Sequence, residues 1–264
     1  MKNNYYSVLI LSIILICLIG CDDENITKNY ELNAYSTDQV SIHQVQSSNT
    51  INISNDLSGI IVTGWSSDNE IRIYVYKTIE ATTNELAESN FDKFQVSFEE
   101  ILDTVFINLN YPTDSDQIKF KSCSISIDIP YSMNCTIGYS DGPVFVSSLS
   151  SSLNVMQANS YVEVENLNGS CNVSSANQIN AVLSIPDSGY CNLNSSNGNI
   201  SVKFPSSINS VLDLHTEEGI IDIGSLEINN LNQTNNSLQG ILGSGNSEMN
   251  VYTQKGDISL SYLQ

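Results

Sequence analysis

The side chains best suited to acid–base or metal chemistry are few and scattered in this sequence of 264 residues. Its two histidines, His43 and His215, are far apart in the chain, and neither belongs to an HExxH or comparable metal-binding pattern. Serines are abundant, but no Ser–His–acid set can be argued from their positions in the sequence. Both histidines are therefore expected at the surface. No catalytic, cofactor-binding or metal-binding residue is predicted.

Acidic residues suggest a different chemistry, because paired carboxylates can hydrolyse glycosidic bonds. Lys203 and Lys255 are the sole cations among residues 135–264, so a groove of mixed charge is not expected there. The carboxylates are predicted to be solvated groups on turns and outward strand positions, with calcium binding by aligned turns as the alternative. The glycosidase candidates are Asp213, Glu217, Glu218, Asp222 and Asp257.

Net charge excludes one class of partner. The chain has 9 basic and 29 acidic side chains, a formal net charge of −20. Such a surface repels phosphate backbones and anionic lipid headgroups, so nucleic acid is not an expected ligand. The composition is nevertheless 41% apolar, which is enough for a folded core.

The N-terminus has the pattern of a bacterial lipoprotein signal. Lys2 precedes an apolar run over residues 8–19, which is shorter than the ~20 residues of a membrane-spanning helix. The tetrapeptide 18–21 resembles a lipobox, in which the cysteine becomes the lipidated first residue. Residues 1–20 are therefore predicted to be a signal peptide and Cys21 the site of lipidation, so that the membrane is contacted through the lipid.

The residues after Cys21 are predicted to form an acidic tether over 21–38. Asp22, Asp23 and Glu24 resemble the signal that sends some lipoproteins to the outer surface; a solvated leader without an address is the alternative. The expected location is the bacterial cell envelope, as an outer membrane lipoprotein, with surface exposure if the acidic residues act as that signal.

Six segments of the second half align with one another without a gap, which is typical of a stacked repeat. Each has apolar residues at its first and third positions and again at its tenth or twelfth, around a polar turn that often holds glycine. Glycine is expected where this turn needs a positive φ. The segments begin at Cys135, Leu153, Cys171, Cys191, Leu212 and Met249.

The spacing of these segments predicts an all-β fold, a right-handed β-solenoid with rungs of 18–21 residues over 39–264. Equivalent apolar residues are expected to form an internal column in chain order, with Leu212 stacked on Cys191. A β-sandwich competes, but it would not require like residues at like positions. One short helix is expected near 83–92, opened by a capping box at Thr82 and Glu85.

Cysteines and tyrosines leave alternatives open. Cys171 and Cys191 share a repeat position, so they are either small apolar core residues or a disulfide pair across neighbouring strands ~4.8 Å apart. Several tyrosines fall near turns and outward positions, where they could contact a glycan or a protein or cover the edges of rungs. These are Tyr139, Tyr161, Tyr190, Tyr252 and Tyr262.

The repeat unit resembles that of the bacterial putative-adhesin family of β-solenoid domains. Residues 195–202 and 253–260 have its pattern of Ser or Thr, a Gly-containing turn and an apolar-x-apolar strand, and residues 51–64 resemble its first rung. Gln178 stands where the pattern has glycine. The resemblance implies a non-catalytic adhesion or binding module for a glycan or protein ligand. A structural or signalling accessory that binds a partner protein is the alternative, ahead of a glycan-active enzyme.

Overall fold

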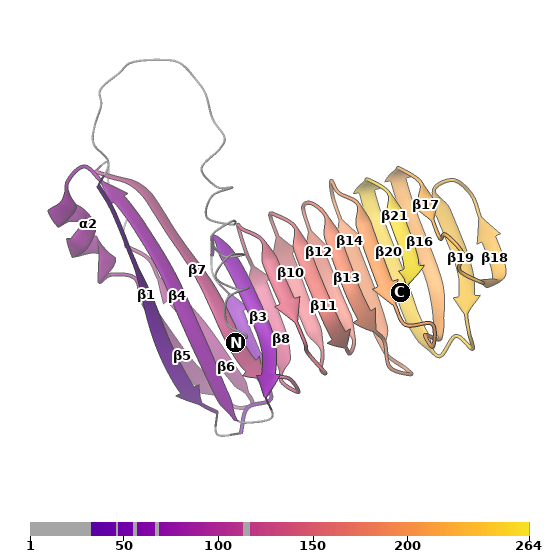
Figure 1. The fold of residues 1–264 in the computed structure, drawn as a ribbon, viewed down its shortest axis with the longest axis horizontal. Coiled ribbons are helices and arrows are strands. Elements are labelled where there is room, and N and C mark those ends of the chain that lie inside the picture. Colours follow the sequence, from indigo (N-terminus) through magenta and orange to yellow (C-terminus); the bar gives the residue numbers. More distant parts are fainter. Residues whose placement is uncertain (1–32, 46, 55–56, 67–68, 113–116, 264) are drawn as a thin grey trace, which may run out of the picture. The chain divides into compact units, whose positions relative to one another are not determined.

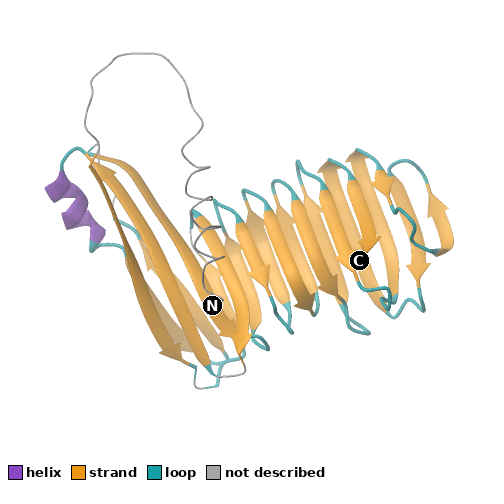
Figure 2. Cartoon of the chain, viewed as in Figure 1, coloured by secondary structure: helices purple, strands orange, loops and turns teal. Residues whose placement is uncertain are grey.

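A computed structural model describes residues 33–45, 47–54, 57–66, 69–112 and 117–263. These residues form two β-sheets and one helix (Figures 1 and 2), which confirms the predicted solenoid-like, nearly all-β fold. The predicted signal peptide and residues 21–32 of the predicted tether, Cys21 included, lie outside the described residues. Residues 33–38 of the predicted tether are part of a β-strand, so the predicted boundary at residue 38 is wrong. No helix in the described part of the chain is long and apolar enough to cross a membrane.

The strands of each sheet are hydrogen-bonded in an order that departs from the chain order. Sheet A runs in the order β1 (Asn33–Gln44), β4 (Glu70–Ala81), β7 (Ile118–Pro130), β3 (Gly59–Ser66), β9 (Val144–Ser147), β11 (Val162–Asn168), β13 (Ile179–Ser184), β15 (Ile200–Phe204), β21 (Ile258–Tyr262) and β17 (Ile221–Asp222). Sheet B runs in the order β18 (Asn229–Gln233), β19 (Ser237–Leu242), β16 (Ser210–Glu218), β20 (Ser247–Lys255), β14 (Tyr190–Ser195), β12 (Cys171–Ser175), β10 (Leu153–Ala158), β8 (Asn134–Tyr139), β2 (Thr50–Ser54), β6 (Thr104–Asn110) and β5 (Gln95–Ile101).

The central part is a parallel solenoid in which each rung contributes one strand to each sheet. In sheet B, Leu153 pairs with Cys171 and Cys171 with Cys191; in sheet A, Val162 pairs with Ile179. Because side chains alternate along a strand, this register places every first and third apolar residue inward. All these inward residues are buried, and the two sheets enclose one continuous core.

The order of the rungs corrects one prediction. Leu212 does not stack on Cys191: Met249 pairs with both of them, so the rung of β20 and β21 lies between the rungs 190–204 and 210–222. The other edge of β16 is occupied by β19, which pairs with it antiparallel. The rung of β2 and β3 is likewise inserted between those of β6–β7 and β8–β9 (Figure 1).

Buried hydroxyl groups link the turn of each rung to the next. The side chain of Ser195 donates to the Asn177 carbonyl at 2.6 Å, and that of Thr253 donates to the Gly198 carbonyl at 2.9 Å. Thr216 in turn donates to the Gly256 carbonyl at 2.8 Å, which follows the inserted order of the rungs. A buried hydroxyl group needs a hydrogen-bond partner, and the main-chain carbonyl of the neighbouring turn supplies it for each of these Ser and Thr side chains.

The turn glycine is required mainly by the close approach of neighbouring rungs. A Cβ on Gly198 would lie 2.3 Å from the Gln178 nitrogen, although φ of Gly198 is not positive. The expectation of positive φ holds at Gly256, where φ is +142°, and is wrong at Gly198. Because glycine has no Cβ, the backbone at Gly198 can lie in contact with the backbone of the neighbouring rung.

The predicted helix is α2 (Asn84–Phe91), but its cap is not the predicted one. Thr83 is the N-cap residue, in an extended conformation, and its hydroxyl accepts a hydrogen bond from the Leu86 nitrogen at 3.2 Å. The capping box at Thr82 is therefore wrong by one residue. Helix α2 packs against β1 and β4 and buries Ala87 and Phe91.

Candidate binding face

The outer face of sheet B carries a ladder of asparagine side chains, one from each of four neighbouring strands. Asn154, Asn172, Asn192 and Asn250 stand in register, and Asp213 continues the row on β16. Each occupies the second position of its segment, between two inward apolar residues. Parallel strands ~4.8 Å apart therefore bring the amides into a line.

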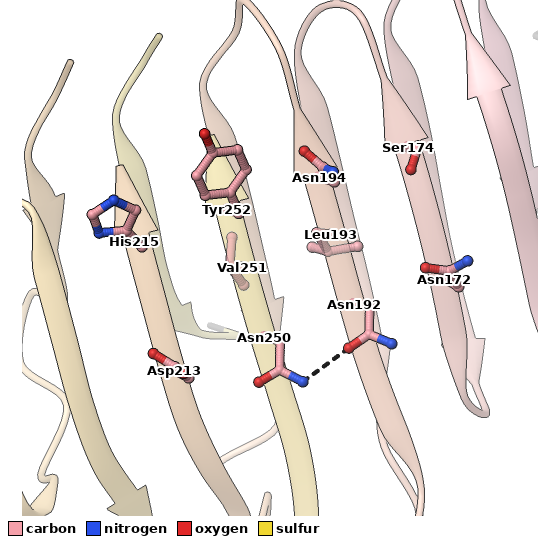
Figure 3. Close-up of a pocket in the computed structure, with 10 residues that line it drawn as sticks. All are labelled: Asn172, Ser174, Asn192, Leu193, Asn194, Asp213, His215, Asn250, Val251 and Tyr252. Carbon is pink, nitrogen blue, oxygen red and sulfur yellow. Dashed lines mark hydrogen bonds between the residues drawn. The ribbon is translucent and has the colours of Figure 1, made fainter. Parts of the chain in front are cut away.

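Hydrogen bonds connect this ladder in two pairs. The Asn172 amide nitrogen donates to the Asn154 oxygen at 3.0 Å, and the Asn250 nitrogen donates to the Asn192 oxygen at 2.9 Å. No hydrogen bond joins Asn172 to Asn192 among the residues that the structure describes. Figure 3 shows the oxygen of Asn172 and the nitrogen of Asn192 on the sides of the two amides that face each other.

An open depression of about 470 Å³ lies over this interruption (Figure 3). A second row of outward side chains borders it: Tyr252 and His215 stack with ring centroids 5.8 Å apart and an interplanar angle of 19°. The Tyr252 hydroxyl donates to a Glu217 carboxylate oxygen at 2.5 Å, and this hydrogen bond raises the pKa of Tyr252. The lining residues are Asn172, Ser174, Asn192, Leu193, Asn194, Asp213, His215, Asn250, Val251 and Tyr252.

Sequence reasoning identified only part of this face. Of the five tyrosines singled out, Tyr252 alone lines the depression; Tyr190 is exposed outside it. Tyr139 donates to Asp141, while Tyr161 packs on Phe145 and Tyr262 on Phe204. The asparagine ladder was missed, although asparagine at the second position of four aligned segments was a visible signal.

The two histidines have different surroundings. His215 is exposed, as predicted. His43 is only partly at the surface: its side chain is 25% exposed and stacks on Phe98 at 5.0 Å, with Nε2 3.6 Å from a Glu100 oxygen. His43 belongs to β1 and Phe98 to β5, so the contact joins the outermost strands of the two sheets.

The carboxylates considered for hydrolysis have separate roles. Asp213 lies in the depression, whereas Asp222 accepts from the Gly224 nitrogen and Asp257 from the Ile220 nitrogen, each at 2.9 Å. Within the described ranges, no group of three or more His, Cys, Asp or Glu side chains is arranged to hold a metal ion.

The cysteines are internal residues. The thiols of Cys171 and Cys191 are 3.3 Å apart, on paired positions of β12 and β14, and both are buried and free. The hydrogen bond with Cys171 and burial raise the pKa of Cys191 well above its ordinary value. A disulfide between these two residues stays a prediction.

The raised pKa values of two further buried thiols predict how the free energy of unfolding depends on pH. Burial raises the pKa of Cys123 and Cys135 to about 12, from an ordinary value of 9.0. Between pH 9 and about pH 12, these two thiols lose their protons in the unfolded chain but keep them in the folded chain. The free energy of unfolding of the reduced protein should therefore be unaffected by these thiols below pH 9. Above it, each thiol should lower the free energy by about 1.4 kcal/mol per pH unit.

Urea denaturation between pH 7 and pH 10.5 measures this slope. In a Cys135→Ala variant the free energy of unfolding should fall less steeply above pH 9 than in the unaltered chain. Equal slopes for the two proteins would show that Cys135 titrates normally in the fold.

Together, the in-register columns, the hydroxyl-linked turns and the open polar face define a parallel β-solenoid with a ligand-accessible sheet. The sequence profile of the Toastrack DUF4097 family matches residues 16–261, and the chain belongs to this family. The resemblance found in the repeat unit is thereby confirmed. No curated protein matches the chain.

The chain is similar to solved structures at low sequence identity, and the first of them shows the same fold. One is called a putative cell adhesion protein, from Clostridium sporogenes; the TM-score is 0.50 at 11% identity, over 87% of this chain and 100% of that one. A second is called a putative adhesin, from Bacteroides fragilis, with a TM-score of 0.33 at 13% identity, over 85% of this chain and 97% of that one.

Proposed function

We propose that this protein is a non-catalytic adhesion or binding module of the bacterial cell envelope, and that the outer face of sheet B is its contact surface. The observation that carries the proposal is the open depression on the asparagine ladder, where polar groups and a stacked aromatic pair converge. A concave site with a few converging polar groups is typical of ligand binding. The name of one similar structure, a putative cell adhesion protein, supports the same function.

A lipid on Cys21 is the proposed attachment, which makes the protein an outer membrane lipoprotein with the solenoid held away from the membrane by the residues between Cys21 and β1. The lipobox-like tetrapeptide and the acidic residues after it support this location. The negative charge of the chain supports attachment through lipid rather than through headgroup contacts.

A partner protein is the second candidate ligand, because the outermost strand of sheet A exposes apolar side chains. Val40 and Ile42 on β1 are 58% and 61% exposed. Among the described residues β1 pairs with β4 alone, and a strand at the edge of a sheet can pair with a strand of another chain. An accessory that binds a partner along β1 would therefore not need the depression on sheet B.

Replacing Tyr252 with alanine separates these two candidates. Cells that display the full chain are tested for adhesion to immobilised envelope fragments and to mucin. The Tyr252→Ala variant should adhere about tenfold less, because a central aromatic contact is lost. Tyr190→Ala is the matched control, since Tyr190 lies on the same sheet face outside the depression and is 43% exposed.

Labelling of intact cells with a membrane-impermeant reagent shows in the same strains that both variants reach the surface. Equal adhesion by the two variants and the unaltered chain would contradict a contact surface on sheet B. A chain that the reagent cannot label would contradict the surface location.

A further inference from the structure

We propose that the interruption of the asparagine ladder between Asn172 and Asn192 binds a hydroxyl group of a neutral saccharide chain. The inference rests on the proposed function and names the ligand class of the same face. Its basis is the set of hydrogen-bonding groups that the ladder leaves unused at this one point.

The two amides present a complementary donor and acceptor to a ligand. The Asn172 nitrogen is used by Asn154, so its oxygen is the group that faces Asn192. The Asn192 oxygen is used by Asn250, so its nitrogen is the group that faces Asn172. A hydroxyl group is both donor and acceptor. It can therefore accept from Asn192 and donate to Asn172, and so complete the ladder.

The border of the depression suits the rest of a sugar ring. Tyr252 and His215 present a stacked aromatic pair beside the ladder. The face of an aromatic ring is negative and attracts the weakly positive C–H groups of a pyranose. Asp213 and Asn194 line the same depression and supply further acceptors and donors for hydroxyl groups.

Charge and apolar content select among ligand classes. Asp213 and Glu217 flank the aromatic pair, and the chain has a net charge of −20, so sulfated or carboxylated glycans are repelled. The apolar side chains that line the depression, Leu193 and Val251, are themselves only 2% exposed. A protein partner usually needs a desolvated apolar pocket for an anchoring residue, and the described residues that line the depression do not form one.

The test uses the chain without residues 1–21 on an array of neutral, amino-bearing and sulfated oligosaccharides, followed by titration with the neutral glycan that gives the strongest signal. In Asn192→Asp the oxygen that accepts from Asn250 is kept, while the donor that faces Asn172 is replaced by an acceptor. Affinity should fall by about tenfold or more, because a hydroxyl loses its donor and meets a carboxylate.

Asn154→Asp is the matched control, because it adds the same charge two rungs along the same ladder. Its oxygen, which accepts from Asn172, is kept, and Asn154 lies outside the depression. Affinity should change by less than about twofold, and the melting temperatures of both variants should show that they are folded.

Three results would overturn the inference. Preferred binding of sulfated glycans would contradict the charge argument, and equal losses in the two variants would remove the role of the interruption. An array without any signal, combined with adhesion that still depends on Tyr252, would leave the proposed function intact and make the ligand a protein. Adhesion independent of Tyr252 would instead contradict the proposed function itself.

Discussion

Replacing Met249 with aspartate should remove a large part of the stability of the protein at room temperature. Met249 is fully buried, and it pairs with Cys191 on one side and Leu212 on the other. A carboxylate there has no partner and interrupts the apolar column at two interfaces. The expected loss is about 4 kcal/mol or more of the free energy of unfolding, against the roughly 5–15 kcal/mol that a typical domain has.

Circular dichroism and urea denaturation measure this loss. Met249→Leu is the matched control, because it conserves volume and apolar character and should lose less than about 1.5 kcal/mol. If β20 instead lay at the free end of the array, Met249 would contact a single rung. A loss of about 1 kcal/mol or less in Met249→Asp would therefore contradict the inserted position.

Replacing Gly142 with alanine should have the second largest effect, at the inserted rung of β2 and β3. A Cβ on Gly142 would lie 1.6 Å from the Ser58 carbonyl oxygen and 2.2 Å from its carbon, both main-chain atoms. The Gly142 nitrogen donates to the Leu57 carbonyl at 3.2 Å, so the two turns are also hydrogen-bonded. Separating them should lower the free energy of unfolding by about 3 kcal/mol, at the upper end for an overpacked site.

Gly59, the first residue of β3, provides the control beside the facing turn. A Cβ there would meet the Ser124 hydroxyl at 3.4 Å, an ordinary contact, and φ of Gly59 is not positive. Gly59→Ala should therefore change the free energy of unfolding by less than about 1 kcal/mol. Any increase would come mainly from the lower conformational entropy of the unfolded chain, because alanine is less flexible than glycine. Similar urea midpoints for the two variants would show that the turns do not need the close approach at Gly142.

Both variants concern positions where neighbours in space are not neighbours in sequence. Segment alignment predicted the rungs, the inward columns and the outward polar positions correctly at Leu153, Cys171 and Cys191. It predicted the wrong neighbour for Leu212. Sequence reasoning also placed His43 at the surface, because nothing local to residue 43 indicates the contact with Phe98 on the other sheet.

The candidate site shows the same division. Tyr252 and Asp213 were recognised as outward residues, and the shared asparagines were readable from the aligned segments. The interruption between Asn172 and Asn192 could not be predicted from the aligned segments, because it depends on which neighbouring amide each asparagine is hydrogen-bonded to. Hydrogen-bond pairing along a ladder is decided by the rungs on both sides at once.

The amino-acid sequence alone determined which side chains face inward and which outward in each rung, because a period of two along a strand is local. It also determined the register, since like residues recur at like positions. Only the tertiary structure decided the order of the rungs. Every rung offers nearly the same apolar positions to its neighbour, so the repeat itself does not distinguish one neighbour from another. The choice depends on distant antiparallel pairings, such as that of β16 with β19, which occupy one edge and leave the other to the C-terminal rung.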